Sequence, residues 1–254
     1  MVKVKIPESH PRRESLLYRD KIVEGLDEGI VSKEGLIAHG RGEAFDYLLG
    51  EKTVEEALDA EKAGVAAMLL GRSSAISVNG NTAALAPEKL IELSELLDAP
   101  LEVNLFYKSE ERVERIIAHL KKHGASRVLG RKGDAKLPIE SERAKVDSDG
   151  IYRADVVLVA LEDGDRTEAL EKMGKSVVAI DLNPLSRTAQ KAAISIIDEL
   201  SRALDNMIDM ARFMRDLSAD ELNSVLESYD NDRILKSTLE KIAKGLMMLG
   251  LESR

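Results

Sequence analysis

The sequence predicts an α/β fold in which a mostly parallel sheet is flanked by helices in three layers. Between residues 75 and 197, short apolar segments alternate with helix-like segments, and this alternation is typical of a parallel sheet covered by helices. Two apolar segments, 155–161 and 176–181, are continuous runs, as expected of strands buried on both faces. Helical patterns precede and follow this region, so we expect N-terminal helices and an all-helical C-terminal extension.

Turn and capping residues place the elements of the sheet region. Pro87 stands where a helix should begin, Ser109 can cap a second helix, and Gly124 should end that helix. A shorter helix over 165–173 should end at Gly174. The polar, glycine-rich stretch 130–150 predicts a loop or hairpin. The expected strands are 75–78, 101–106, 127–129, 155–161, 176–181 and 193–197.

Capping patterns also mark the flanking helices. One helix should begin near Glu14, and the residues from Thr53 to Glu56 match a capping box that opens another. A second capping box starts at Ser218, and the last helix carries an apolar stripe as far as Met247. We predict an α/β domain over residues 1–204, including a helical segment over 1–72. A helical extension over 205–254 should pack on this domain or on a dimer partner.

The composition excludes several classes of protein. The 254 residues include no Cys, so disulfides, thiolate catalysis and Cys-based zinc sites are excluded. Acidic residues outnumber Lys and Arg by 46 to 37, and aromatic residues are only 3 %, which argues against nucleic-acid binding. No apolar run approaches the roughly 20 residues that span a bilayer. No signal-peptide pattern opens the chain, so we expect a cytoplasmic protein without a membrane partner.

Three short motifs mimic functional sites in the wrong context. Gly40-Arg41-Gly42 resembles the start of a dinucleotide fingerprint, but no good strand precedes it and Phe45 replaces the third glycine. Gly174-Lys175-Ser176 mimics a phosphate loop, but it leaves a helix and enters a strand, whereas a phosphate binds where a helix begins. His119 and His123 have metal-ligand spacing, yet their position near lysines favours a solvated helix end.

The segment AIDLNPLSRTA, residues 179–189, carries the clearest signal of a site. A strand ends at Asp181 and Asn183, and Ser186 can cap a helix that begins near Arg187 and Thr188. Ligands of open α/β sheets lie beyond the carboxyl ends of the strands, and a helix start with an Arg and a Thr hydroxyl suits a phosphate. Asp181 or Asn183 can bind a ribose hydroxyl or a base edge. The alternative is that these residues only form the turn between a strand and a helix and bind no ligand.

Asparagines mark two further strands. Asn79 and Asn81 flank Gly80 between a strand and a helix. Their amides can orient a carboxylate or a phosphate, or simply form a turn. Asn104 lies inside an apolar strand, where a buried amide needs partners, so it is either structural or part of a pocket lining.

Charged residues offer more contacts at the same edge of the sheet. Asp163 and Asp165 follow the strand 155–161 and can hold Mg²⁺ or an amine, or Asp165 can cap the next helix. Arg41 is flanked by glycines near Glu43, and Arg19 either binds a phosphate or faces solvent. Together these residues imply a large pocket for an anionic ligand of nucleotide size, without naming a reaction.

Six segments, in this order, resemble the archaeal phosphopantothenate synthetase (4-phosphopantoate–β-alanine ligase) family. They run from about residue 6 to 205 and read IPESHPRRESL, GLIAHGRGEAFDYLLGE, SVNGNTAAL, LEVNLF, ADVVLVALEDGDR and IDLNPLSRTA. The resemblance implies a Rossmann-like homodimer whose nucleotide-binding catalytic domain covers residues 1–204. It also implies the synthesis of 4′-phosphopantothenate, for coenzyme A, from 4-phosphopantoate, β-alanine and ATP, with release of AMP and diphosphate.

The resemblance further implies roles for individual residues. Arg19 and Arg41 match arginines that contact ATP. Asp181-Leu182-Asn183 matches the nucleotide-binding strand end, and Arg187-Thr188 matches the helix start that faces the phosphates. Asp198-Glu199 matches a further contact, where this sequence departs from the Asp-Asn of the family in a way that a main-chain contact tolerates.

An amide ligase of this kind converts its carboxylate into an acyl-adenylate before the amine of β-alanine displaces AMP. Mg²⁺ and arginines stabilise the charge that builds up at the phosphates, and we assign this role to Arg19, Arg41 and Arg187. We assign 4-phosphopantoate to the three asparagines and the amine or the metal to three carboxylates, without naming the metal ligands: Asn79, Asn81 and Asn104, and Glu43, Asp163 and Asp165. The alternatives are a kinase, another carboxylate–amine ligase, or a non-catalytic ATP-sensing dimeric module.

Overall fold

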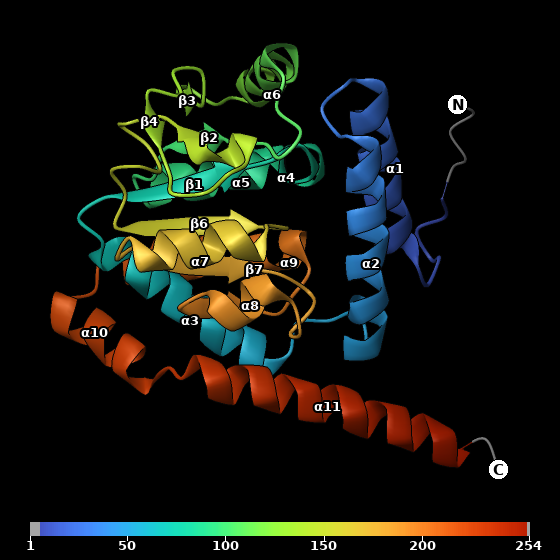
Figure 1. The fold of residues 1–254 in the computed structure, drawn as a ribbon. Helices are drawn as coiled ribbons and strands as arrows, with labels where there is room; N and C mark the ends of the chain where they lie inside the picture. Colours follow the sequence, from blue (N-terminus) through green and yellow to red (C-terminus); the bar gives the residue numbers. More distant parts are fainter. Residues whose placement is uncertain (1–5, 253–254) are drawn as a thin grey trace.

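Six parallel strands form the central sheet of the computed structural model, which describes residues 6–252 (Figure 1). Their order is β3-β2-β1-β6-β7-β8, and each neighbouring pair is parallel. Along the chain this is the 3-2-1-4-5-6 order of a Rossmann sheet, which reverses its direction of winding between β1 and β6. The strands are β1 (Ser74–Val78), β2 (Leu101–Val103), β3 (Val128–Leu129), β6 (Val156–Ala160), β7 (Ser176–Ile180) and β8 (Ile194–Ile196).

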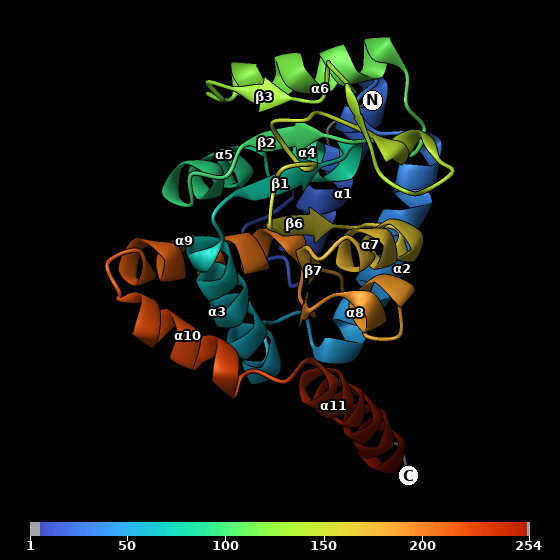
Figure 2. The same ribbon diagram turned by 60° about the vertical axis from the view of Figure 1, so that its left-hand side comes forward.

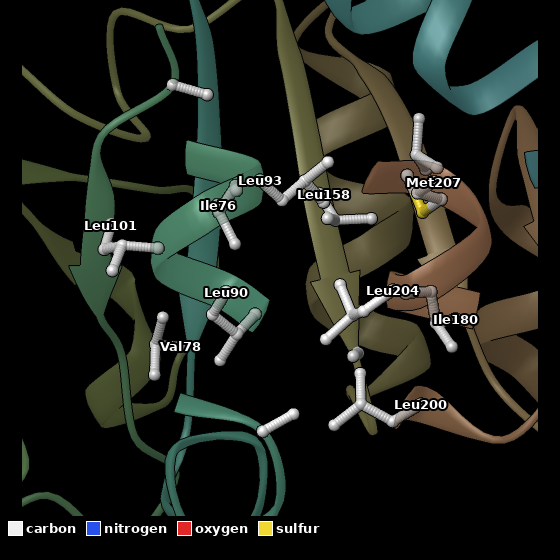
Figure 3. Packing of buried hydrophobic residues seen from close by; sticks show 14 of the residues in the cluster. Ile76, Val78, Leu90, Leu93, Leu101, Leu158, Ile180, Leu200, Leu204 and Met207 are labelled. Atoms are coloured by element: carbon white, nitrogen blue, oxygen red, sulfur yellow. The ribbon is translucent and has the colours of Figure 1, made fainter. Parts of the chain in front are cut away.

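Successive residues of a strand point to opposite faces of the sheet, and each face has its own core. Ile76 of β1 is in register with Leu158 of β6, and both belong to the larger buried cluster. Figure 3 shows them beside Leu93 and Leu204, which come from covering helices. Val157, one residue before Leu158, belongs to the second cluster on the other face. Both faces are therefore buried, as the apolar runs predict.

Helices cover the two faces and complete three layers, so the predicted fold class is confirmed (Figures 1 and 2). On the face of the larger cluster lie α3 (Glu55–Leu70), α5 (Pro87–Leu96), α6 (Glu110–Lys122) and α9 (Leu200–Met214). On the other face lie α7 (Gly164–Lys172), α8 (Arg187–Lys191) and a hairpin of β4 (Ala135–Lys136) and β5 (Lys145–Val146), which are joined through the 3-10 turn η1 (Glu142–Ala144).

Two antiparallel helices, α1 (Arg13–Asp27) and α2 (Lys33–Leu49), lie across the carboxyl ends of the strands (Figure 1). The helix α2 lies within the helical segment predicted over residues 1–72, but its bounds were not predicted, because glycines interrupt its sequence and lower its helix propensity. Packing overrides propensity here. A Cβ atom on Gly35 would lie 2.3 Å from Oδ1 of Asn81, so the glycine allows α2 to approach α4 (Gly80–Leu85) closely.

The C-terminal region is helical, as predicted. After α9 come α10 (Ala219–Ser228) and the long α11 (Asn231–Glu252), which packs on α2, α3, α8 and β8 of the same chain. The capping box at Ser218 is confirmed, since Ser218 and Glu221 exchange both hydrogen bonds. The division at residue 204 stays a prediction; α9 runs continuously across it, with Met207 and Met214 in the larger cluster.

The capping box predicted at Thr53 is wrong. The helix α3 begins one residue later than that box requires, with Val54 at its N-cap and no side-chain cap. The Thr53 hydroxyl donates instead to Oδ2 of Asp198 at 2.5 Å, and Glu56 pairs with Lys241. The Thr53 side chain therefore does not cap α3, because it is bonded to Asp198, a residue far along the sequence.

Candidate functional site

The candidate site lies along the carboxyl edge of the sheet, where the loops after β1, β6, β7 and β8 meet the α1–α2 pair. In an open α/β sheet, ligands bind in the crevice at the point where the winding reverses. Here that point lies between β1 and β6. The polar strand ends after β1, β6 and β7 are adjacent, so the structure brings together the clusters that the sequence predicts at separate places.

Three hollows line this edge. The switch-point crevice, of about 340 Å³, opens between the loops after β1 and β6; its lining includes Gly35, Arg41, Asn79, Asn81, Arg112, Arg143 and Asp163. The β7–β8 pocket, beside it, includes Tyr18, His39, Glu43, Asp181, Leu182, Asp198 and Glu199. The Arg187 pocket includes Phe106, Asp163, Asp165 and Arg187. Asp163 borders the switch-point crevice and the Arg187 pocket, and Leu161 borders the switch-point crevice and the β7–β8 pocket, so the three hollows adjoin one another along the edge.

The loop after β7 is a tight turn that its own side chains stabilise. The Asp181 carboxylate accepts hydrogen bonds from the backbone N–H of Asn183 at 3.0 Å and from the Ser186 hydroxyl at 2.5 Å. Ser186 in turn caps α8 by accepting from the Ala189 amide, as predicted. Burial raises the pKa of Asp181, whereas its two hydrogen bonds and the charge of Arg41 lower it. These hydrogen bonds fix the shape of the turn, which places Leu182 at the β7–β8 pocket.

The helix start after this loop faces the loop after β6. The Thr188 hydroxyl donates to the Glu162 carbonyl at 2.8 Å and is buried, so this side chain joins two loops. Arg187 is exposed and pairs with Asp165 at 2.6 Å. A Cβ atom on Gly164 would lie 2.3 Å from Cβ of Arg187, so only glycine lets α7 and α8 begin this close together. The N-cap position of α7 is occupied by Asp163. Asp165 therefore does not cap this helix, and its side chain pairs with Arg187 instead.

The predicted arginines of α1 and α2 differ in their freedom. Arg19 makes a bidentate pair with Glu43, with distances of 2.8 Å from Nη2 and 3.0 Å from Nε. Arg41 is exposed, and within residues 6–252 it makes no hydrogen bond or ion pair. Arg41 is thus free to bind an anion in the switch-point crevice, whereas Arg19 must first leave Glu43.

The three predicted asparagines are structurally engaged. Asn79 forms a capping box with Thr82 at the start of α4, and its amide nitrogen donates to the Ala160 carbonyl at 2.8 Å. The Asn81 amide donates to the Gly35 carbonyl at 2.8 Å. Asn104 is fully buried and donates to the carbonyls of Arg143 and Lys145. Asn79 and Asn81 still line the switch-point crevice, while Asn104 lies behind it and supports Arg143.

Sequence reasoning missed the buried arginines near the crevice. Glu162 is fully buried between Arg143 and Arg166 and pairs with both. Arg143 also lies 3.0 Å from Asp163, and Arg166 donates to the Ser77 hydroxyl. The arginine charges lower the pKa of Glu162, although burial opposes this. Arg143 comes from the segment predicted only as polar loop or hairpin, which gave no signal of a site.

Arg112 also enters the crevice, from α6. Its Nε donates to the Ile30 carbonyl at 2.8 Å and its Nη1 to the Tyr107 carbonyl at 3.0 Å. Burial and the nearby charge of Arg143 lower its pKa. Two guanidinium groups therefore approach each other at one end of the crevice, and an anion between them would relieve their repulsion.

The loop after β8 is held by distant residues. Asp198 accepts from the Thr53 hydroxyl and from Nη2 of Arg202 at 2.7 Å. Arg202 also pairs with Asp46 of α2 at 2.5 Å, so it links the loop to the helix above it. The Glu199 carboxylate caps α9, and burial raises its pKa to about 7. Both predicted side chains are engaged within the protein, and the loop borders the β7–β8 pocket.

Among the described residues, no group of three or more His, Asp or Glu side chains is arranged to hold a metal ion. His119 and His123 pair with Glu28 and Glu88. Their side chains are only 16 % and 29 % exposed, so the solvated helix end expected for them is wrong. No helix in residues 6–252 is both long and apolar enough to cross a membrane.

These features define a Rossmann-like α/β protein with an arginine-lined crevice at the switch point of its sheet. The chain belongs to the phosphopantothenate/pantothenate synthetase family, whose model matches residues 56–245. It is 53 % identical over 251 residues to the 4-phosphopantoate–β-alanine ligase of Thermococcus kodakarensis, an alignment that covers 98 % of this chain and 96 % of the relative. The enzyme of the same name from Methanosarcina mazei is 52 % identical, with 98 % of both chains covered. The family resemblance that the motifs indicate is therefore confirmed.

Proposed function

We propose that this chain is a 4-phosphopantoate–β-alanine ligase, which forms 4′-phosphopantothenate with cleavage of ATP to AMP and diphosphate. The observation that carries the proposal is the near-complete alignment with ligases of this name, at about half identity, in Thermococcus and Methanosarcina. The site supports it, because three adjoining hollows along one sheet edge bring together arginines for the phosphates and carboxylates for an amine.

The nucleotide belongs at the loops after β7 and β8 in this proposal. Asp181 and Leu182 form one wall, with Asn183 next to them in the same turn, and Asp198 and Glu199 form the other. Because the Asp198 and Glu199 carboxylates already accept hydrogen bonds within the protein, their contribution is through the main chain and the shape of the pocket. The departure at Glu199 from the Asp-Asn of the family is compatible with this arrangement.

The phosphates need the arginines that are free to turn. Arg41 makes no hydrogen bond or ion pair within residues 6–252, although its charge acts on Asp181. Arg187 needs only to leave its surface ion pairs with Asp165 and Glu168, which costs little. Arg19 contributes indirectly while it is paired, by fixing Glu43 at the β7–β8 pocket. Charge that develops on the phosphates during adenylation would be stabilised by these guanidinium groups without reorganising solvent.

The acid fits the switch-point crevice. Arg112 and Arg143 can bind its phosphate, and the start of α4, with Asn81, can orient the carboxylate towards the nucleotide. For the amine, the carboxylates of Glu43 and Asp163 can bind the ammonium form. His39 lies in the β7–β8 pocket, and burial lowers its pKa, so the neutral imidazole can accept a proton from the amine.

Mg²⁺ fits this donor set as a companion of ATP. It usually keeps several waters and binds one or two carboxylates together with substrate phosphates, so it needs no protein cage. Asp163, which is half-buried at the junction of two hollows, is the carboxylate best placed to bind it. When bound, the ion would neutralise charge on the phosphates.

We also propose a cytoplasmic homodimer. Support comes from apolar side chains that the single chain leaves exposed, on α2 (Ile37 and Leu48) and near the end of α11 (Leu246 and Met247). The earlier part of the α11 stripe, at Ile234, Leu235 and Ile242, is buried in the chain's own core. Light scattering after size exclusion would give the molar mass of the assembly.

The activity is tested by incubating the protein with ATP, Mg²⁺, 4-phosphopantoate and β-alanine and separating the nucleotides. We expect AMP and diphosphate in equal amounts, with amide product that depends on β-alanine. ADP would identify a kinase instead. ATP binding without turnover would identify a sensing module, and AMP that forms equally without β-alanine would reject the ligase.

A further inference from the structure

A buried carboxyl group lies near the loop after β8 and has no role in the proposed chemistry. Glu61, in the middle of α3, has no exposed surface. Its Oε2 accepts a hydrogen bond from the Asn206 amide at 2.9 Å. Its Oε1 is also buried and accepts no hydrogen bond from any described residue. A buried carboxylate oxygen without a donor is costly, so the geometry favours a protonated carboxyl group.

Asp198, on the loop after β8, is a close neighbour of Glu61. The Asn206 amide nitrogen that donates to Glu61 also lies 3.4 Å from the Thr53 hydroxyl, and that hydroxyl donates to Asp198. Asp198 already accepts from the Thr53 hydroxyl, the Glu199 amide at 2.7 Å and the guanidinium of Arg202. All of these groups donate to Asp198, so Asp198 acts as the acceptor in this cluster. Two adjacent buried carboxyl groups cannot both be ionised cheaply, so the proton belongs to Glu61.

We propose that Glu61 is a positioning residue for the nucleotide pocket, which fixes the loop after β8 by donating a hydrogen bond from its carboxyl group to Asp198. The inference rests on the proposed function only in naming ATP as the ligand. Glu61 is not among the residues that line the pocket, so it acts through Asp198, which is. The loop spans just residues 197–199, so a shift of Asp198 displaces the pocket wall directly.

The same contact couples the pocket to α2. Arg202 joins Asp198 to Asp46, which lies on the helix that carries Arg41 and Glu43. Ionisation of Glu61 would place a second negative charge against Asp198 and compete for Arg202. We therefore expect it to disturb the loop and α2 together.

The protonation of Glu61 is stable at neutral pH. Burial, and then the charge of Asp198, raise the pKa of Glu61 from its ordinary value of 4.5 to about 9, although Arg202 and the Asn206 amide oppose this. The charged groups that act on Glu61 are thus Asp198 and Arg202, with Asp46 and Glu199 facing Arg202 in turn. ATP affinity should fall as the pH rises through about 9, because the donor to Asp198 is then lost.

Calorimetric ATP binding, from pH 7 to 10, tests the proposal with three variants. Glu61→Gln keeps a donor for Asp198 and an acceptor for Asn206, so its affinity at pH 7.5 should stay within about threefold of wild type and should lack the alkaline decline. Glu61→Ala removes both, and we expect a loss of about tenfold in affinity at pH 7.5. Glu56→Gln makes the same chemical change on the same helix but beside Lys241, and should bind like wild type at every pH.

Binding separates this inference from the proposed reaction, because it is measured without turnover. If the wild type binds ATP but forms no AMP, the ligase proposal fails, while the ATP affinities of the variants still test the role of Glu61. If Glu61→Ala does not fold, the comparison between Glu61→Gln and wild type still decides. An alkaline decline that persists unchanged in Glu61→Gln, or an affinity at pH 7.5 as low as the tenfold loss expected for Glu61→Ala, would overturn the proposal.

Discussion

Two neighbouring loops form the walls of the β7–β8 pocket, and they are held in opposite ways. The loop after β7 depends on residues close in sequence: Asp181 accepts from Asn183 and Ser186, which lie two and five residues further on. The loop after β8 depends on residues from other elements. Asp198 accepts from Thr53, 145 residues earlier, and its partner Arg202 binds Asp46, 156 residues earlier.

Substitutions in the loop after β7 should therefore affect ligand binding without much effect on stability, whereas substitutions in the loop after β8 should affect both. A local turn keeps its shape whatever packs around it, so changes there should affect ligand contacts more than folding. The loop after β8 is a junction of α2, α3 and α9, so changes there should affect the fold and the pocket together. Three substitutions can break or sharpen this comparison.

The largest effect is expected from Asp198→Ala. The change leaves the Thr53 hydroxyl and the Glu199 amide without an acceptor and leaves Arg202 with Asp46 alone. Removing one member of a buried ion pair costs about 3–5 kcal/mol, and we expect a loss of that size in the free energy of unfolding, measured in urea by circular dichroism. Asp205→Ala on α9, which breaks a more exposed pair with Lys89 of α5, should cost less than about 1 kcal/mol. Equal losses in both variants would show that the junction is not structural.

The same contrast explains what the sequence could predict. The turn after β7 was predicted in detail, including the Ser186 cap, because all its partners lie within a few residues. The capping box at Thr53 follows an equally local rule and was wrong, since Asp198 competes for the hydroxyl from far along the chain. Asp198 was found only through family resemblance, and Glu61 was not found at all.

Tertiary packing also decided the features that the sequence could not show. The strand order depends on which loops cross the sheet, and periodicity within a strand carries no information about its neighbours. The helix α2 exists despite its glycines because it packs on α4 and α11. Arg143 had no local signal; its significance comes from the burial of Glu162 beside it.

Arg187→Ala tests the binding role of the local wall. The arginine is exposed and its pair with Asp165 is at the surface, so the free energy of unfolding should change by less than about 0.5 kcal/mol. If Arg187 binds a phosphate of ATP, kcat/KM should fall by about 100-fold, the size expected for one charged hydrogen bond in the transition state. Lys191→Ala removes an exposed charge from the same helix and serves as the control. Wild-type turnover in Arg187→Ala would remove this residue from the site.

The smallest effect is expected from Ser186→Ala, which removes the cap of α8 and one of the two hydrogen bonds to Asp181. Loss of an N-cap costs about 1 kcal/mol, and a turn that is still held by the Asn183 amide should bind ATP within about threefold of wild type. Ser218→Ala removes the equivalent cap from α10, outside the residues that line the three hollows, and should cost about the same stability with no change in ATP affinity. If Ser186→Ala instead destabilised the protein as much as Asp198→Ala, the wall after β7 would also depend on distant packing, and the contrast between the two loops would disappear.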